Sequence, residues 1–549
     1  MKISPIIILL FFSSIIGFNS QYNFIFSQQV QQEWVARYFG TGSTSNLNSS
    51  VVLDKLGNIY VGGVTHTASN GDDYLVIKYS SSGNQQWIRT YNGPGNNQDF
   101  ITSIALDDSD NVYVTGTSVG AEFDFATIKY NSSGIQKWVS RYIGPNDAEG
   151  GGTEIAYDNP GIIYVLGNSG LITNGSDAIL IKYNAQTGDT VWVRRFHETG
   201  FWGNYEEQGY SICLGHHGDE YITGSSYWNH GPPFEDFLTL KYDSEGTLIW
   251  VKKYNGIGNS VDIGRAVYLD NTGNVIVTGY TTDNNYNVAY GTIKYSPAGV
   301  QEWITTYTGP NQTHYDNYAV GIVADVQGNI FVTGSSFGNN ETDYTTIRYN
   351  EDGVQQWVSI YNGTGNGSDD VYGITIDDSS NVFITGRSLN TNMNFDITTI
   401  KYNINGNQQW VMRYSGIPSD YQPIVVDNYY NVYVVGRDSL EAAIIIKYSQ
   451  PIGIKKISNS FPEKFSLSQN YPNPFNPRTN FRFEIPKESY TKLIVYDMIG
   501  REVGILVNEK LQPGKYEMEW DAGNYASGVY FYKFISGDYT DTKKMVLMK

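Results

Sequence analysis

The chain has 549 residues, of which 15% are aromatic and 17% charged, with 58 glycines and one cysteine, Cys213. This length is too great for one ordinary core, and the composition excludes a helical protein and any intrachain disulfide. The net charge of −19 is uneven, with −22 on the first 450 residues and +3 on the rest, so no nucleic acid is expected as a partner.

The N-terminal stretch, MKISPIIILLFFSSIIGFNS, carries one cation, Lys2, followed by an apolar run from Ile6 to Phe18. That run is too short to span a bilayer comfortably and is typical of a secretory signal peptide. We expect a signal peptide and leader over residues 1–27, cleaved near residue 20 or 27. No later run is long enough to cross a membrane, so the mature protein is predicted to be exported without a transmembrane segment.

A unit with one marker tryptophan recurs through residues 28–450. Each unit has four β-prone runs, such as ITSIALD (101–107), NVYVTGTS (111–118), DFATIKYN (124–131) and QKWVSRYI (136–143). Four strands in about fifty residues predict a blade of a β-propeller, whose faces are buried only when neighbours stack on them. The markers are Trp34, Trp87, Trp138, Trp192, Trp250, Trp303, Trp357 and Trp410.

The two ends of the repeat array predict how the ring closes. The second-strand signature (NVYVTG-like) and the third-strand signature (IKY-like) each occur eight times, but the eighth unit ends at residue 448 without its tryptophan strand. The chain instead begins with an unmatched one, QQEWVARYFG (31–40). We therefore predict an all-β, eight-bladed β-propeller whose last blade is closed by the N-terminal strand, which leaves no open sheet edge.

The pattern D-x-x-G-N-V-Y-V-T-G-x-S, then I-K-Y, then G-x-x-x-W-x-x-x-Y resembles the bacterial SBBP repeat family over roughly residues 31–450. The resemblance implies a β-propeller fold and no particular chemistry. The family's name denotes seven blades, and the count of eight departs from it by one.

The tail is expected to be a separate module. Residues 451–463, PIGIKKISNSFPE, are predicted to be a linker, and 464–549 a small antiparallel, immunoglobulin-like sandwich. This tail resembles the type A C-terminal sorting domain of the type IX secretion system. The resemblance implies export by that machinery to the outside or outer-membrane surface of a Gram-negative-type bacterium. The matching residues include Asn470, Tyr471, Pro472, Asn473, Pro474, Phe475, Asn476, Pro477, Gly528 and Tyr530.

A ligand site is expected where the repeat is broken. The longest gap between markers holds two insertions, 197–209 and 226–237, which should open on the same face of the propeller. Aromatic rings with carboxylates between them suit stacking on sugars, whereas the alternative is a small satellite core under long loops. The candidate ligand-binding residues are Trp202, Trp228, Tyr205, Tyr227, Glu206 and His230.

No metal site or cofactor is expected, with calcium as the alternative. Calcium would use strand-one carboxylates, Asp99, Asp262 and Asp369, each eight residues before a turn aspartate, but no compact calcium loop is present. The strand-three aspartates, such as Asp177, read as scaffold. His66, His197, His230 and His314 fall on one face but in different repeats, which disfavours a shared metal.

Taken together, these features predict a non-catalytic, surface or extracellular protein that binds a glycan or a protein. One alternative is a purely structural envelope or matrix component. The other is an enzyme: YNAQTGDTVW (183–192) resembles the repeats of quinoprotein dehydrogenases, although a single cysteine excludes their vicinal disulfide. A polysaccharide-degrading enzyme would use Glu206 or Glu207 with Asp236 as acid and base.

Overall fold

The computed structural model describes residues 30–548 except 41–46, 68–70, 145–148, 172–174, 201–202, 205, 216–217, 228–234, 312–316, 339–340, 420–422, 429, 450–454, 459–461 and 523–524. The expected signal peptide lies outside the described residues. These residues form strands and no helix, so no helix among them is long and apolar enough to cross a membrane.

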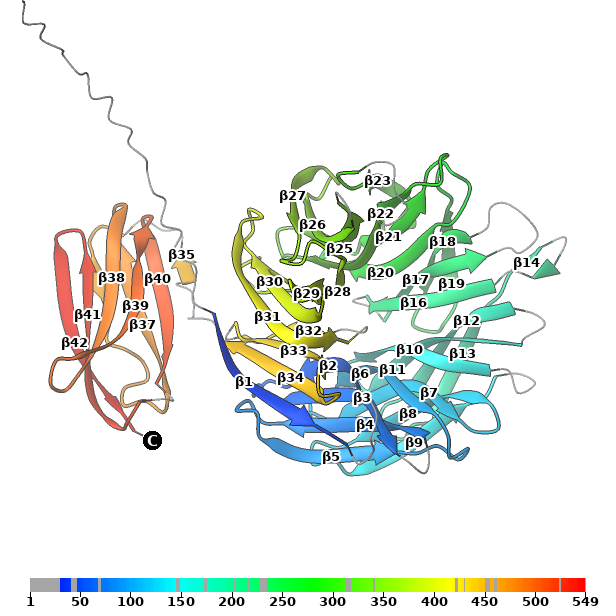
Figure 1. Cartoon of the computed structure of the whole chain (residues 1–549), viewed down its shortest axis with the longest axis horizontal. Helices are drawn as coiled ribbons and strands as arrows, with labels where there is room; N and C mark the ends of the chain where they lie inside the picture. Colours follow the sequence, from blue (N-terminus) through cyan, green and yellow to red (C-terminus); the bar gives the residue numbers. More distant parts are fainter. Residues whose placement is uncertain are drawn as a thin grey trace, which may run out of the picture.

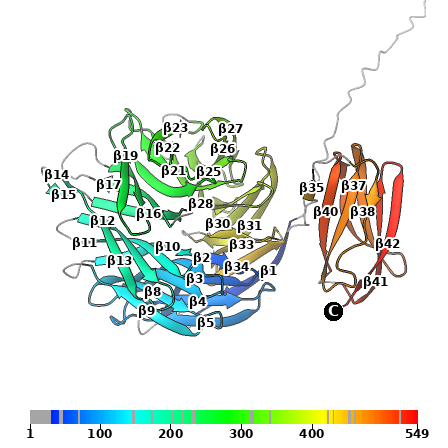
Figure 2. The same ribbon diagram turned by 180° about the vertical axis from the view of Figure 1, so that it is seen from behind.

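Residues 31–449 form antiparallel sheets that are arranged radially around a ring (Figures 1 and 2). The first four complete units follow the predicted order of strands. Their strands are β2 (Leu47–Leu53), β3 (Ile59–Thr67), β4 (Gly71–Tyr79), β5 (Gln85–Tyr91); β6 (Asp99–Leu106), β7 (Val112–Val119), β8 (Phe123–Tyr130), β9 (Gln136–Tyr142); β10 (Glu149–Asp158), β11 (Ile162–Leu171), β12 (Gly175–Asn184), β13 (Thr190–Phe196); β16 (Glu206–Leu214), β17 (Glu220–Tyr227), β18 (Glu235–Tyr242) and β19 (Leu248–Tyr254).

The remaining units continue around the ring. Their strands are β20 (Ile263–Leu269), β21 (Val275–Thr282), β22 (Val288–Tyr295), β23 (Gln301–Tyr307); β24 (Tyr318–Ala324), β25 (Ile330–Phe337), β26 (Thr342–Tyr349), β27 (Gln355–Tyr361); β28 (Asp369–Ile376), β29 (Val382–Leu389), β30 (Phe395–Tyr402), β31 (Gln408–Pro418); and β32 (Ile424–Val426), β33 (Val432–Asp438) and β34 (Ala443–Ser449).

The predicted closing strand is present. β1 (Gln31–Tyr38) pairs antiparallel with β34, and Figure 1 shows the blue N-terminal strand beside the orange one. The end of β31 also pairs with β33, which joins β28–β34 and β1 into one eight-stranded sheet. The number of blades stays a prediction, since these last strands share one continuous sheet.

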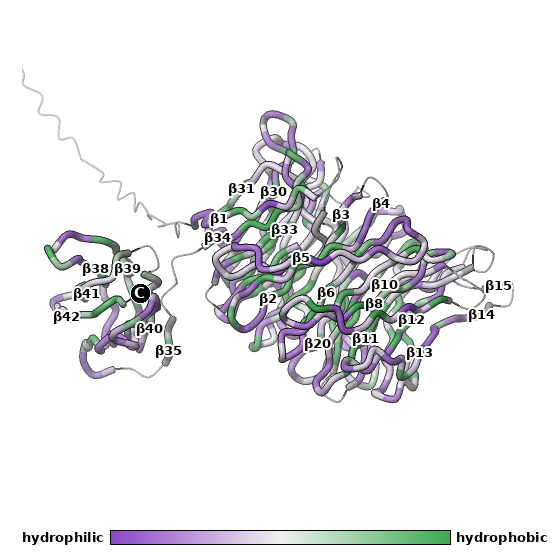
Figure 3. The backbone as a smooth tube through the Cα atoms, turned by 90° about the horizontal axis from the view of Figure 1, so that it is seen from below, coloured by the Kyte–Doolittle hydropathy of each residue, from purple (hydrophilic) through white to green (hydrophobic). Residues whose placement is uncertain are grey.

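The hydrophobic core lies between successive sheets, which explains why a single unit would not fold alone. One cluster joins Tyr74 of the first unit with Val114 of the second, and another joins Tyr433 of the last sheet with Val51 of the first. In Figure 3 hydrophobic residues follow the strands, while hydrophilic ones are frequent in the connections. Burial between neighbours all the way round therefore holds the ring together.

The marker tryptophan links each unit to the next. The ring of Trp87 packs on Gly134 of the following unit, where an added Cβ would lie 2.8 Å from the ring, and its indole N–H donates to the Ser132 carbonyl at 3.1 Å. Gly134 has a φ of 78°, so this turn also favours glycine by its backbone. Trp34 on β1 packs in the same way on Gly83, so the closing strand repeats the contact.

The C-terminal module is a sandwich of two four-stranded sheets, as predicted. Part of the expected linker is itself a strand: β35 pairs antiparallel with β40 and forms one edge of a sheet. The strands are β35 (Lys455–Ser458), β36 (Ser466–Leu467), β37 (Arg478–Ile485), β38 (Ser489–Asp497), β39 (Glu502–Leu511), β40 (Gly514–Asp521), β41 (Gly528–Ser536) and β42 (Tyr539–Leu547).

Candidate functional site

The broken repeat lies between β13 and β18. The first insertion forms a two-stranded ribbon, β14 (Thr199–Gly200) with β15 (Gly203–Asn204), which extends from the outer side of the ring in Figure 1. Of the predicted ligand-binding residues, Glu206 and Tyr227 are described. They face each other across β16 and β17, and both are half-buried. Trp202, Tyr205, Trp228 and His230 lie outside the described residues.

The strand-three aspartates have a structural role in three units, because a strand-four arginine pairs with them there. Arg141 donates to Asp124 at 2.7 Å, and Arg413 donates to Asp396 at 2.9 Å. Each aspartate is almost fully buried, so the ion pair compensates the loss of hydration.

The strand-one aspartates are held by the loop that precedes them. The Asp99 carboxylate accepts from the Gly93 N–H at 2.7 Å and from the Val119 N–H at 3.1 Å. The carboxylates of Asp262 and Asp369 accept from the equivalent glycine N–H groups, at 2.7 Å and 2.5 Å. The loop sequence N-G-x-G-N explains this contact, because its glycines let the backbone approach the carboxylate. Calcium at these three positions stays a prediction, and the geometry gives the carboxylates a structural role.

Glu207 occupies the same position in the broken repeat but has a different environment. It is opposite Ser226 on β17, as Asp99 is opposite Ser118 on β7. Its side chain is 0% exposed, and neither carboxyl oxygen has a hydrogen-bond partner among the described residues. Burial raises the pKa of Glu207 to about 8. The first insertion thus replaces the glycine loop whose N–H group donates to the carboxylate at this position in three other units.

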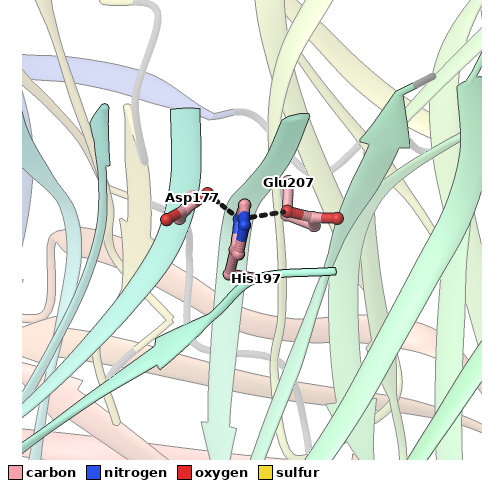
Figure 4. Close-up of side chains that lie close together, drawn as sticks. All are labelled: Asp177, His197 and Glu207. Carbon is pink, nitrogen blue, oxygen red and sulfur yellow. Dashed lines mark hydrogen bonds and ion pairs between the residues drawn. The ribbon is translucent and has the colours of Figure 1, made fainter. Parts of the chain in front are cut away.

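His197 lies between Glu207 and Asp177 (Figure 4). Its Nδ1 is 2.9 Å from Asp177 Oδ1 and 4.0 Å from Glu207 Oε2. Asp177 is 1% exposed and its second oxygen accepts from Arg195. One candidate ligand atom from each of these three residues lies within 4.8 Å of the other two. The first insertion therefore joins residues of two neighbouring sheets.

Further charged groups surround this cluster. Lys253, the cation that lowers the pKa of Glu207, is itself paired with Glu198. Asp236 on β18 shares a row with Glu207, with Ser226 between them, so their Cα atoms are about 10 Å apart. Burial raises the pKa of Asp236 to about 6. The site therefore concentrates carboxyl groups that resist ionisation.

Sequence reasoning placed Glu207 in this region but missed its contact with His197 and Asp177. It assigned Asp177 to the scaffold and separated His197 from any partner because the histidines are in different repeats. The available signal was that His197 stands five residues after its marker tryptophan, where three other units have asparagine.

In the sandwich, the sorting motif combines buried anchors with exposed residues. Asn470 is 2% exposed, and its side-chain N–H donates to Thr479 at 2.8 Å. Phe475 is 2% exposed in the core, and its N–H donates to the Val546 carbonyl of β42 at 3.0 Å. Tyr471 is 80% exposed. The remaining motif residues are distributed as follows: Pro472, Asn473, Pro474 and Asn476 are exposed, Pro477 and Gly528 are half-buried, and Tyr530 is buried.

Comparison with known proteins agrees with both modules. A family described as secretion system C-terminal sorting domain matches residues 469–548, and one described as beta-propeller repeat matches 86–124 and 356–393. An uncharacterized WD repeat-containing protein, L264, of Acanthamoeba polyphaga mimivirus is 24% identical over 481 residues, covering 64% of this chain and 34% of that protein. The chain thus spans about a third of the length of this curated relative.

Solved structures with a similar arrangement of strands were also identified. Quinohemoprotein alcohol dehydrogenase from Comamonas testosteroni aligns with a TM-score of 0.50 and 12% identity, covering 80% of this chain and 79% of that one. PorZ, an essential bacterial surface component of the type-IX secretion system of Porphyromonas gingivalis, aligns with a TM-score of 0.33 and 14% identity, covering 92% and 76%. At such identities the dehydrogenase indicates a shared propeller fold alone. The chain is therefore a secreted or cell-surface protein that combines SBBP beta-propeller repeats with a type IX secretion system C-terminal sorting domain.

Proposed function

We propose that the exported propeller is a non-catalytic binding protein, and that it holds an extracellular glycan or protein on the face where the two insertions open. The observation that carries this is the pairing of Glu206 with Tyr227. Glu206 belongs to the first insertion and Tyr227 to the second, so the two insertions meet where β16 pairs with β17, with both side chains on the same side of that sheet. The break in the repeat is thus a single local feature.

The chemistry of this face favours a polar ligand with flat, weakly apolar surfaces. Tyr227 offers a ring, and Glu206 a carboxylate that accepts hydrogen bonds from hydroxyl groups. Such a combination suits a sugar chain better than a nucleic acid, which the −19 net charge repels.

The test is binding of residues 28–549 to a panel of polysaccharides. A Tyr227→Ala variant and a Trp202→Ala/Trp228→Ala variant run beside the parent. Loss of a stacking aromatic should weaken binding about tenfold, or roughly 1–2 kcal/mol. Tyr286→Ala is the control, because this tyrosine is 60% exposed in the corresponding β21–β22 loop of the next unit. Equal binding by parent and both site variants would reject the site.

A second candidate is a polysaccharide-degrading enzyme. The row formed by Glu207 and Asp236 supports it, because two carboxyl groups with raised pKa values are typical of acid–base catalysis. Release of reducing ends from a panel polysaccharide, abolished by Asp236→Asn, would favour the enzyme. Binding without turnover would favour the binding protein. If the protein neither binds nor cleaves any polysaccharide of the panel, a structural role in the envelope or matrix is favoured.

A further inference from the structure

Two departures from the repeat meet in one place, and we propose that together they form a metal site. Asp177, His197 and Glu207 would bind one divalent transition-metal ion, with zinc as the ion to test. The inference is independent of the glycan or protein ligand proposed above, because none of its three side chains is among the residues proposed to contact that ligand.

The repeat itself provides the internal comparison for Glu207. In three other units the carboxylate at this position accepts a hydrogen bond from a loop glycine, so it is satisfied by the fold. Glu207 is as buried as these aspartates, but no loop glycine donates to it, and neither of its oxygens has a hydrogen bond of ordinary geometry among the described residues. The Glu198 backbone and the Ser226 hydroxyl lie near enough to lower its pKa, yet burial outweighs them. A buried carboxyl group without a partner is costly, and a bound cation is one way to compensate that cost.

His197 is the second departure. The corresponding position is asparagine in three other units, at Asn92, Asn255 and Asn362. The only unit with histidine here is therefore the one whose loop leads to the uncapped glutamate. Its Nδ1 is directed between the two carboxylates (Figure 4), at 2.9 Å from Asp177 and 4.0 Å from Glu207. Neutral imidazole with carboxylate oxygens is a ligand set that zinc and its neighbours accept.

The geometry and charge fit one ion. Ligand atoms around an ion at about 2.1 Å lie roughly 3–3.5 Å apart, so small side-chain rotations would close the present separations. The two carboxylates would balance the charge of a divalent ion. Arg195 already holds the outer oxygen of Asp177, which fixes the orientation of that ligand as partners outside the first shell do in metal sites. Three protein ligands would leave at least one coordination position open.

The experiment uses the untagged chain from residue 28 to 549, treated with chelator and titrated with Zn²⁺ by calorimetry. We expect one equivalent to bind, and His197→Asn and Glu207→Gln each to weaken binding by at least about tenfold. His66→Asn is the matched control. This histidine pairs with Asp72 at 2.8 Å and has a similar exposure, but among the described residues no third ligand group completes a metal-binding cluster with it. Its substitution should leave the affinity unchanged.

A spectroscopic measurement covers the case in which Glu207→Gln does not fold. Co²⁺ bound by the parent should give visible d–d absorption, and His197→Asn, which places the residue of three other repeats at this position, should remove it. The proposal is overturned if the parent shows no saturable binding up to about 1 mM Zn²⁺. It is also overturned if His197→Asn binds as tightly as the parent, or if His66→Asn weakens binding equally.

Discussion

Replacement of Glu220 by valine should stabilise the propeller at neutral pH. Glu220 opens β17 and its side chain is 0% exposed. In every other repeat the same position, directly before the second-strand aromatic or isoleucine, holds a buried valine or isoleucine. These residues are Ile59, Val112, Ile163, Val275, Ile330, Val382 and Val432.

The magnitude follows from the pKa of Glu220. Burial raises it from 4.5 to about 8, against the opposing effects of the Tyr164 hydroxyl and the Lys182 ammonium. Between these two pH values the folded protein holds a proton that the unfolded chain has lost, so stability falls as the pH rises. At about 1.4 kcal/mol per pH unit, the loss is of the order of 3 kcal/mol by pH 7. Valine at this position has no ionisable group, so it removes the pH-dependent loss of stability, and it restores the apolar packing of the other repeats.

The assay is urea unfolding of the parent and Glu220→Val between pH 4.5 and pH 8. We expect the difference in unfolding free energy to be smallest near pH 4.5 and to grow by about 4 kcal/mol by pH 8. Other buried carboxyl groups, such as Glu207, affect both proteins equally and cancel in the difference. Glu245→Val, which removes an exposed glutamate of the same repeat, should show no such trend. A variant that is less stable than the parent at pH 7, or a difference that does not change with pH, would refute the reasoning.

Three further predictions concern packing. Trp34→Ala should lower the unfolding free energy by about 2–4 kcal/mol in urea titrations, because it removes the ring that joins β1 to the first repeat. Gly134→Val should lower the thermal midpoint, at a cost of roughly 2 kcal/mol or more, since its side chain would collide with Trp87; a midpoint equal to that of the parent contradicts the packing. In the sandwich, Asn470→Ala should destabilise by about 1–3 kcal/mol, whereas Tyr471→Ala should stay within about 0.5 kcal/mol in calorimetry, because only the asparagine is buried.

Much of the fold could be predicted because the sequence repeats. Each marker tryptophan fixes a strand, and the unmatched QQEWVARY predicted that β1 would complete the last sheet. The structure confirms the pairing of β1 with β34 and adds an ion pair between Arg37 and Asp438 at 2.8 Å. Arg37 stands three residues after Trp34, as Arg141 stands three after Trp138, but its partner Asp438 ends β33, whereas Asp124 lies on strand three. The closing strand thus uses an equivalent arginine with a carboxylate from a different strand.

The rest could not be read from local patterns. The extension of β31 to Pro418, which joins two sheets, depends on a backbone that stays extended beyond the usual end of strand four. The cluster around His197 depends on two sheets meeting, and its members are separated by 20 and 10 positions in the chain. No spacing rule predicts which nitrogen of a histidine faces which carboxylate, because side-chain direction is set by the packing of both sheets.

Comparison of the repeats also indicates which residues have a functional role. Stacked units stabilise one another only while their buried positions agree, so a departure at such a position lowers stability unless something compensates it. The described part of the broken repeat holds two of these departures, Glu207 at one end of β16 and Glu220 opposite the other end. Glu207 adjoins the insertions and a histidine, and a ligand or an ion could compensate its burial. Glu220 has no such neighbours in the described structure, so its replacement should only stabilise. If Glu220→Val stabilises the protein and Glu207→Gln loses Zn²⁺ binding, then the buried Glu220 is a tolerated structural defect and the buried Glu207 has a functional role.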